Sequence, residues 1–525
     1  MQMAVSEPSG ATLRSALSLA LLFAAVRLVL HLATALWQSH IGYGYFRDEF
    51  YYIACGRRLA WGYVDHGPIV AIQARLAETL FGHSLAGLRA LSALGGTLRV
   101  ALTGLLCWLL GGRRSAQALA MLFVLLAPIY LGTDGYLSMN SWESAFWMPC
   151  VMALILILRN KNPRLWWTLL GISAGLGLLN KPSMAFFLVA LGGGLLLTPQ
   201  RKILFTRYAM WGIALLVLIA LPNLLWQMHH GWATLEFLHN GRIGGKNSQL
   251  SPLAFLANQI FVLGIIGAFV WVDGLVHLLR AREERWLGLT YCLFLAIMMA
   301  LGAKDYYVAP VYPCLFAAGG VAWQCRFAHQ PRVQSDRIIA WPVLTIVSIV
   351  LSAIFLPMSI PVLRPAAFQK FVRTLHLPST DSENGKRAAL PQFYADRFGW
   401  QEEVDQITSA VQQLSPADRS HAGILVDNYG EAGALDFLGH DLPPVVSGHN
   451  NYWLWGPRGV GGKVLIVISG DPPQHFQALC QKVEVVGRMN HPLAMPSERK
   501  QIYLLHSCQE AQSPTLNWAM YKHYY

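Results

Sequence analysis

The chain has 525 residues, of which 54% are hydrophobic and 13% are charged, and its formal net charge at pH 7 is +12. Soluble globular proteins carry about 25% charged residues, so this composition excludes a disordered chain, a small disulfide-stabilised protein and an ordinary cytosolic enzyme. Residues 1–357 hold 26 Lys and Arg against 13 Asp and Glu, whereas residues 358–525 hold 14 against 15. We therefore predict a membrane region followed by a water-soluble region.

The membrane region is predicted to cross the bilayer about eleven times as α-helices. A crossing helix needs about 20 predominantly apolar residues. The runs that meet this need are 15–37, 88–110, 115–132, 141–158, 165–180, 183–198, 208–226, 253–279, 286–302, 306–324 and 338–357. We predict that the first is an uncleaved anchor, because its apolar run is too long for the core of a signal peptide.

Positive residues concentrate in alternate connections between these helices, which predicts the orientation of the chain. Connections 111–114, 159–164, 198–207, 280–285 and 326–337 carry two or three Lys or Arg each, and the short connections between them carry one or two. This pattern predicts a cytoplasmic N-terminus and an extracytoplasmic region 358–525. The long outward loop 38–87 is the exception, with four arginines, and we predict that it is functional.

The C-terminal third is predicted to be a linker, residues 358–392, followed by a periplasmic α/β domain, residues 393–525. Residues 393–413 have helical periodicity, and β-rich runs cover 423–427, 464–469, 483–486 and 502–506. Residues 421–438 read as strand, turn and helix. No Gly-x-Gly-x-x-Gly follows a predicted strand here, which argues against a Rossmann dinucleotide site.

Cys480 and Cys508 are the two cysteines of this outer domain. We hypothesise that they form a disulfide, because they flank two candidate neighbouring strands and the outside of a cell is oxidising. Two buried free thiols are the alternative.

The outward loop after the first crossing carries the densest set of chemically useful residues. Tyr45-Phe46-Arg47-Asp48-Glu49-Phe50-Tyr51-Tyr52 is followed by Arg57-Arg58 and then by Trp61-Gly62-Tyr63-Val64-Asp65-His66-Gly67-Pro68. These runs predict carboxylates, guanidinium groups and a histidine at the membrane interface, where charge is costly unless it is used or hidden. The alternative is an interfacial helix with solvated charges and an aromatic belt.

Three further outward connections add acids and bases. They are 133–143, with Asp134, Asn140 and Glu143; 180–182, with Lys181; and 304–307, with Lys304 and Tyr307. Each lysine taken singly could be an interfacial residue that extends to water. Together the three connections predict carboxylates and cations on one face of the helix bundle.

These motifs resemble the polytopic, lipid-linked-sugar glycosyltransferases of the C-type fold. More narrowly, they resemble the superfamily of protein O-mannosyltransferases and bacterial aminoarabinose transferases. The resemblance implies that a sugar moves from a polyprenyl phosphate, such as undecaprenyl phosphate, to a lipid, glycan or protein of the cell envelope. The transfer would occur at the outer face of the inner membrane.

The resemblance also implies roles for individual residues. Asp48, in the Asp48-Glu49 motif, would be the general base that deprotonates the acceptor, a role worth about 10²–10⁴-fold in rate. The polyprenyl phosphate leaves as a stable anion, so no second carboxyl group has to protonate it, in contrast to glycoside hydrolysis. Cations would meet the developing charge of the phosphate. Lys304 matches that role best, with Tyr307 as a hydrogen-bond donor, and the further candidate cations are Arg57, Arg58 and Lys181.

Substrate contacts are assigned to Asp65, His66, Asp134, Asn140 and Glu143, with two departures from the family pattern. His66-Gly67-Pro68 stands where the aminoarabinose enzymes have Lys-Pro-Pro, so His66 would serve the acceptor instead of a phosphate. The second acid of the family aligns near Asp134 or Asn140, and Glu143 could take its role. A divalent metal is compatible with these carboxylates, although no ligand spacing demands one.

A membrane transporter or lipid flippase with an accessory outer domain is the alternative function. Transporters place polar groups near the bilayer midplane, whereas here charge clusters at the outer rim and mid-helix charge is limited to Arg27, Arg99 and Asp273. A third alternative, an envelope scaffold, predicts that Asp48→Asn affects no reaction. Nucleic-acid binding is not supported, because the inward connections account for the positive charge.

Overall fold

The computed structural model describes residues 12–244, 250–328, 334–377, 388–509 and 513–525. The chain forms two compact units, which we describe separately. The helical unit comprises Met1–Leu36, Ala86–Trp226 and Asn247–Val362, and the sheet unit comprises Trp37–Leu85, Gln227–Lys246 and Leu363–Tyr525.

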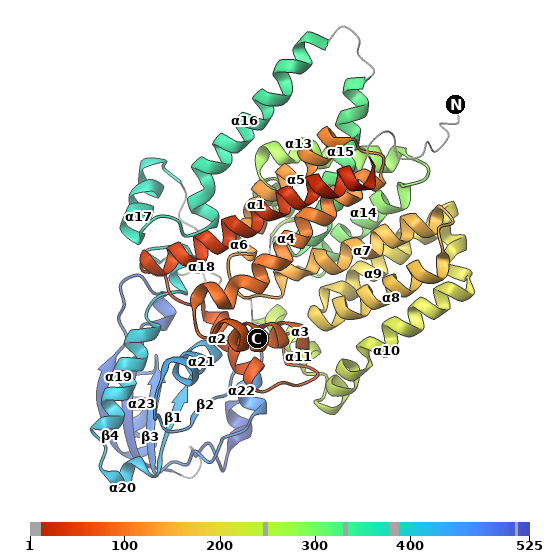
Figure 1. Cartoon of the computed structure of the whole chain (residues 1–525). Coiled ribbons are helices and arrows are strands. Elements are labelled where there is room, and N and C mark those ends of the chain that lie inside the picture. The colour runs from red at the N-terminus through yellow and green to blue at the C-terminus, as the bar shows by residue number, and fades with distance from the viewer. Residues whose placement is uncertain (1–11, 245–249, 329–333, 378–387, 510–512) are drawn as a thin grey trace. The chain divides into compact units, whose positions relative to one another are not determined.

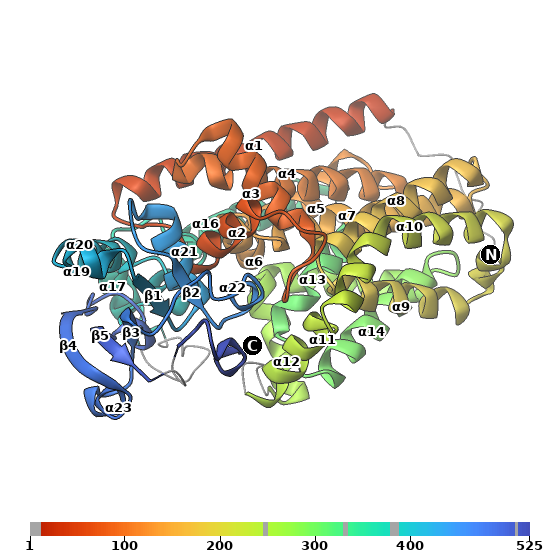
Figure 2. The same cartoon turned by 90° about the horizontal axis from the view of Figure 1, so that it is seen from below.

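The helical unit is built from apolar helices joined by short connections (Figure 1). Its elements are α1 (Leu13–His40), α4 (Leu85–Leu109), α5 (Arg114–Leu126), α6 (Pro128–Thr133), α7 (Asn140–Leu158), α8 (Pro163–Asn180), α9 (Ser183–Leu196), η1 (Pro199–Phe205), α10 (Arg207–His229), α12 (Pro252–Leu263), α13 (Ile265–Arg280), α14 (Arg285–Ala300), η2 (Asp305–Val311), α15 (Tyr312–Ala328) and α16 (Gln334–Ser359). Helices α7 and α8 lie side by side, as do α9 and α14 (Figures 1 and 2).

The helices confirm a multi-pass helical membrane protein, but not the predicted count of eleven crossings. Among the described residues, five helices are long and apolar enough to cross a membrane, or up to seven if each of two bent pairs forms one crossing. The bent pairs are α9 with η1, at 120°, and α12 with α13, at 111°. Three other apolar helices have only 10–17 residues each. A hydropathy pattern does not show where a helix bends or ends early, which explains the difference in count.

Close packing fixes the helix ends that carry polar residues. The Trp147 ring on α7 stacks on Phe187 of α9 with 4.3 Å between centroids, and Phe294 of α14 meets it edge-on at 5.2 Å. Offset and edge-on aromatic pairs add stability beyond the area that they bury. The start of α7 and the start of α9 are thereby held at fixed positions in this core.

The sheet unit contains a five-stranded mixed sheet in the order β2-β1-β3-β5-β4. Its strands are β1 (Ala422–Val426), β2 (Val445–Ser447), β3 (Val464–Ser469), β4 (Cys480–Arg488) and β5 (Gln501–Cys508). Strand β1 pairs in parallel with β2 and β3, whereas β5 pairs antiparallel with β3 and β4. The uninterrupted apolar run of β3 follows from its central position, where both of its faces are buried.

Short helices complete the sheet unit. They are α2 (Arg47–Arg57), α3 (Pro68–Phe81), α11 (Ala233–Ile243), α17 (Pro365–Thr374), α18 (Gln392–Ala395), α19 (Trp400–Gln412), α20 (Pro416–Arg419), α21 (Tyr429–Leu438), α22 (Asn451–Leu454), α23 (Pro473–Gln477), η4 (Pro496–Glu498) and η6 (Trp518–Tyr521). Helix α2 packs against α21, which joins the predicted outer loop to the C-terminal residues within one unit.

The predicted C-terminal elements agree with this structure except at three places. All four β-rich runs are strands, and β2 was not predicted because it has only three residues. The predicted helix over 393–413 is two helices, α18 and α19, separated at Gly399, whose φ of 96° lies in the region that favours glycine. The predicted linker contains α17, and its residues 378–387 lie outside the described part of the chain.

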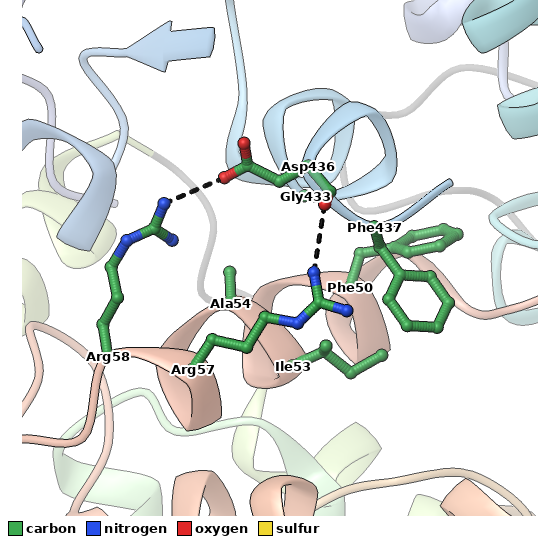
Figure 3. A pocket seen from close by; sticks show the side chains of 8 residues that line it. All are labelled: Phe50, Ile53, Ala54, Arg57, Arg58, Gly433, Asp436 and Phe437. Atoms are coloured by element: carbon green, nitrogen blue, oxygen red, sulfur yellow. Dashed lines mark hydrogen bonds and ion pairs between the residues drawn. The ribbon is translucent and has the colours of Figure 1, made fainter. Parts of the chain in front are cut away.

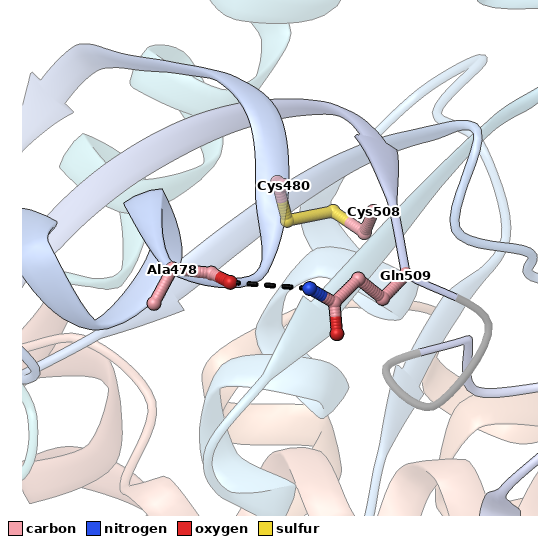
Figure 4. The surroundings of a disulfide bond; sticks show 4 residues. All are labelled: Ala478, Cys480, Cys508 and Gln509. Carbon is pink, nitrogen blue, oxygen red and sulfur yellow. Dashed lines mark hydrogen bonds between the residues drawn. A yellow bond between two sulfur atoms is a disulfide. The ribbon is translucent and has the colours of Figure 1, made fainter.

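The hypothesised disulfide is confirmed. Cys480 and Cys508 face each other on the antiparallel strands β4 and β5 and are bonded (Figure 4). Beyond the bond, the Gln509 side chain donates a hydrogen bond to the Ala478 carbonyl. The bond and this contact together close the end of the β4–β5 pair.

Candidate active site

Asp48 lies in the first turn of α2, in the sheet unit, and its side chain is 26% exposed. The next residue, Glu49, is fully buried and accepts a hydrogen bond from the Phe46 backbone N–H at 2.8 Å. Such a contact satisfies a backbone donor at the start of a helix. Glu49 therefore stabilises the start of α2, while Asp48 remains reachable.

Within the sheet unit, Asp48 contacts Tyr429, the first residue of α21. The Tyr429 hydroxyl donates to Oδ1 of Asp48 at 2.9 Å. Burial, with the charge of Asp48, raises the pKa of Tyr429 well above its ordinary value, so its hydroxyl stays a hydrogen-bond donor at neutral pH. Among the described residues, Oδ2 of Asp48 has no hydrogen-bond donor. One oxygen is thus held and the other can accept a proton.

The contact between α2 and α21 depends on glycine at position 433. A Cβ atom at Gly433 would lie 2.8 Å from the Cβ atom of Phe50, closer than real Cβ atoms approach each other. Asn428 begins α21, because its side chain accepts from the Gly430 and Glu431 backbone N–H groups. The Asn-Tyr-Gly sequence thereby places the Tyr429 hydroxyl at Asp48.

A second carboxylate, Asp65, is linked to the same site through stacked tyrosines. The Tyr51 hydroxyl donates to Oδ1 of Asp65 at 2.8 Å, and the Tyr51 ring stacks on Tyr429 with 4.6 Å between centroids. Nε2 of the buried His66 lies 4.0 Å from the same Asp65 oxygen. Burial lowers the pKa of His66, so its imidazole is neutral at pH 7 and suits a neutral acceptor better than a phosphate.

In the helical unit, the three predicted connections meet around Lys181. Its Nζ atom lies 2.8 Å from Oδ1 of Asn140 and 3.0 Å from Oε2 of Glu143, and it sits 4.4 Å from the centroid of the Tyr307 ring. Lys304 directly precedes η2, and its carbonyl accepts from the Tyr307 backbone N–H. Within this unit the structure brings Lys181, Glu143, Asn140 and Tyr307 together, and the role of this group in the reaction stays a prediction.

Asp134 is placed differently from its predicted role in substrate binding. Its side chain is fully buried, with Oδ2 2.6 Å from Nη2 of Arg27 and Oδ1 2.9 Å from Nη1 of Arg99. Both mid-helix arginines are also buried. Because two guanidinium groups already bind both oxygens, we interpret Asp134 as the centre of a structural ion cluster and do not include it in the site.

Arg57 and Arg58 line a cavity together with residues of α2 and α21 (Figure 3). Residues nine positions apart on a helix are rotated by about half a turn and separated by about 13 Å along the axis. A general base acts at about 3 Å from its hydroxyl, and the leaving phosphate lies one sugar carbon farther on. We therefore do not assign the departing phosphate to these two arginines.

The described residues contain no group of three or more His, Cys, Asp or Glu arranged to hold a metal ion. The predicted site residues divide into two sets. Asp48, Glu49, Asp65, His66, Arg57 and Arg58 belong to the sheet unit, and Lys181, Lys304, Tyr307, Asn140, Glu143 and Asp134 belong to the helical unit.

Sequence reasoning missed the contacts of Tyr51 and Tyr429. Tyr51 lies one helical turn after the Asp48 motif, and Tyr429 follows a predicted strand and turn. Residues in a connection that follows a strand are common site residues. That signal could have marked Tyr429 as a site candidate, but it does not indicate the contact with Asp48.

Comparisons with known proteins agree with this description. Residues 65–226 match the family of dolichyl-phosphate-mannose-protein mannosyltransferases. The undecaprenyl phosphate-α-4-amino-4-deoxy-L-arabinose arabinosyl transferase 1 of Pseudomonas fluorescens is 24% identical over 251 residues, which are 45% of this chain and 44% of that protein. The match therefore spans less than half the length of that relative.

Solved structures extend the similarity of fold to most of the chain. The crystal structure of ArnT from Cupriavidus metallidurans bound to undecaprenyl phosphate has a TM-score of 0.59 at 15% identity, and the match covers 92% of this chain and 97% of ArnT. The mycobacterial arabinofuranosyltransferase AftD has a TM-score of 0.51 at 13% identity over 96% of this chain and 42% of AftD. These comparisons confirm the resemblance predicted from the motifs.

Proposed function

We propose that this chain, a relative of the dolichyl-phosphate-mannose-protein mannosyltransferases with an ArnT-like fold, is a membrane glycosyltransferase. It transfers a sugar from a polyprenyl phosphate, such as undecaprenyl phosphate, to an acceptor of the cell envelope. The observation that carries this proposal is the state of Asp48, which has one oxygen held by Tyr429 and the other open. That arrangement suits a carboxylate that must take a proton from an incoming hydroxyl group.

The proposed reaction is a single displacement at the anomeric carbon. Oδ2 of Asp48 accepts the proton of the acceptor hydroxyl as its oxygen forms the new glycosidic bond. The bond from the anomeric carbon to the phosphate oxygen breaks, and its electron pair leaves with the polyprenyl phosphate. Because the entering and leaving oxygens lie on opposite sides of that carbon, we expect inversion of its configuration.

The neighbours of Asp48 are proposed to orient it and to bind the acceptor. Tyr429 holds Oδ1 and so fixes the direction of Oδ2. Asp65 and the neutral imidazole of His66 would contact the acceptor. Asp65 is itself held by the Tyr51 hydroxyl, and Tyr51 stacks on Tyr429. Groups held in this way need little reorganisation when the reaction occurs.

Cations of the helical unit are proposed to stabilise the leaving phosphate. Glu143 forms an ion pair with Lys181, and the Lys181 ammonium makes a cation–π contact with the Tyr307 ring. Lys304 and the Tyr307 hydroxyl add a second positive charge and a donor from the same connection. Asn140 orients the Lys181 ammonium. An ammonium group acts as a point charge on a phosphate, which suits a charge that develops during the reaction.

The proposal includes an orientation in the inner membrane. The distribution of Lys and Arg supports a cytoplasmic N-terminus and a periplasmic C-terminal region. The reaction would then take place at the periplasmic face. The acceptor would be a hydroxyl group of an envelope lipid, glycan or protein.

Analysis of envelope glycans in a deletion strain tests this proposal. We expect mass spectrometry to show the loss of one sugar from an envelope component, and wild-type protein to restore it. Asp48→Asn should not restore it, although the protein should still insert in the membrane. The matched control is Asp405→Asn, the same change at an exposed acid of α19, which should restore it fully.

The same experiment separates the transferase from the alternative transporter or flippase. Because a transporter moves its substrate without a proton-accepting step at Asp48, the Asn variant would keep most of its function. Full restoration by Asp48→Asn would therefore contradict the proposed reaction.

A further inference from the structure

A cavity of about 250 Å³ lies between α2 and α21 in the sheet unit (Figure 3). Both helices supply side chains to it, and the lining residues are Phe50, Ile53, Ala54, Arg57, Arg58, Gly433, Asp436 and Phe437. Ligand pockets commonly measure about 300–1,000 Å³, so this one has room for a headgroup-sized ligand but not for a long chain. The proposed reaction makes no use of it.

Two guanidinium groups face this cavity, and they keep hydrogen-bond donors to spare. Arg57 binds Oε1 of Glu78 through Nε and Nη2, at 3.0 and 2.6 Å, and donates from Nη1 to the Asp436 carbonyl at 3.1 Å. Arg58 donates from Nη2 to Oδ2 of Asp436 at 3.2 Å. Each guanidinium has five N–H donors, so both retain donors for a ligand.

The local charge is positive. Asp436 is the acid that lines the cavity, and it is shared, because Nη1 of Arg458 lies 3.4 Å from its Oδ1 atom. Glu78 is likewise shared between Arg57 and Arg75. The guanidinium of Arg58 lies 4.4 Å from the centroid of the Trp455 ring, which holds it in place without using its donors.

The rest of the wall is apolar. Phe50 and Phe437 form one side, and Ile53 and Ala54 lie beside them along α2 (Figure 3). A site with this lining favours a ligand whose anionic group sits beside an apolar part. A planar guanidinium binds a carboxylate or a phosphate through two parallel hydrogen bonds. Of the two, a phosphate offers more acceptor oxygens and more charge for a pair of guanidinium groups.

We propose that this cavity binds a phosphate monoester or diester whose neighbouring part is apolar. Arg57 lies about half a turn around α2 from Asp48 and about 13 Å along the helix axis, so this binding site is separate from the proposed reaction centre. The phosphate could come from a lipid headgroup or from a small soluble phosphate, and both share this chemistry. The inference depends on the contacts of the sheet unit and not on the transferase activity.

Binding to the purified full-length chain in detergent tests the site. The probes are dioctanoyl phosphatidic acid, inorganic phosphate and, as an uncharged control, dioctanoylglycerol. We expect phosphatidic acid to bind the wild type. Arg58→Gln should weaken this binding at least about tenfold, and Arg58→Lys should weaken it several-fold, because an ammonium lacks the planar fork.

The matched control is Arg499→Gln, which removes the same charge at an exposed position of the same unit. Its affinity should remain within about twofold of the wild type, since an exposed charge outside the cavity lining contributes little. Ala54→Leu should also weaken binding, because it fills the cavity without changing the charge. If Ala54→Leu fails to fold, Arg58→Gln still tests the site, because the Arg58 side chain is 31% exposed and its replacement should not prevent folding.

The outcomes distinguish the sources of the phosphate and the two proposals. Tighter binding of phosphatidic acid than of inorganic phosphate supports a lipid headgroup, and equal binding supports a soluble phosphate. Binding that is absent, or equal in Arg58→Gln and Arg499→Gln, overturns the site. Asp48→Asn should bind the probe normally, so a failure of the transferase proposal would leave this result unchanged.

Discussion

Tyr429→Phe removes the hydroxyl that holds Oδ1 of Asp48 and leaves the aromatic ring in place. A hydrogen bond to a charged group contributes about 1.5–3 kcal/mol. Since the Asp48 side chain is 26% exposed, water replaces part of this loss and the lower value applies. A loss of about 1.5 kcal/mol at the transition state is about tenfold in rate. We therefore expect a drop of about tenfold in kcat with a smaller change in KM.

The assay is the release of polyprenyl phosphate from a lipid-linked sugar donor, measured over a range of donor and acceptor concentrations so that kcat and KM are obtained separately. The matched control is Tyr503→Phe, which removes a buried hydroxyl that donates to the Asp471 carbonyl in the same unit. A wild-type kcat in Tyr429→Phe would refute the positioning role.

Three further predictions concern stability, each measured by thermal unfolding of the purified protein. Asp134→Asn should lower the free energy of unfolding by about 3–5 kcal/mol, because it leaves two buried guanidinium groups without a carboxylate. The control Asp273→Asn, at a half-exposed ion pair, should lower it by less than about 1 kcal/mol. Equal effects of the two variants would contradict the ion cluster. Reduction of the Cys480–Cys508 bond, which closes a separation of 28 residues, should cost about 3.5 kcal/mol, and the double Ser variant should not respond to reductant. Burial raises the pKa of Asp396 to about 7, and the nearby charge of Arg47 lowers it by a smaller amount. The native state therefore keeps a proton on Asp396 that the unfolded chain releases above about pH 4. Stability should therefore fall as pH rises from about 4 to 7, by at most about 1.4 kcal/mol per pH unit, and Asp396→Asn should flatten that slope.

The sequence predicts the strands of the sheet unit well because each is a short β-rich run between turn residues. β3 has the predicted bounds, and the predicted pairing of Cys480 and Cys508 follows from the neighbouring strands β4 and β5. The helices of the outward loop were harder to predict. α2 mixes charged and aromatic residues on all sides, since one side packs on α21 and another carries Asp48.

The candidate site could be predicted in part. Asp48 and Lys181 stand out as charges beside apolar helices, which is a costly position. The structural role of Asp134 could not be predicted, because its partners Arg27 and Arg99 lie 107 and 35 positions away in sequence. Tyr429 is 381 positions from Asp48, and no local pattern indicates a contact at that separation.

Reconstitution of the purified protein in liposomes with a sugar-linked polyprenyl phosphate tests the central claim most directly. We predict that the wild type releases free polyprenyl phosphate as it glycosylates an acceptor, and that Asp48→Asn releases it at least about a hundredfold more slowly. The Asp405→Asn control should match the wild type. Turnover by Asp48→Asn at the wild-type rate would contradict the account.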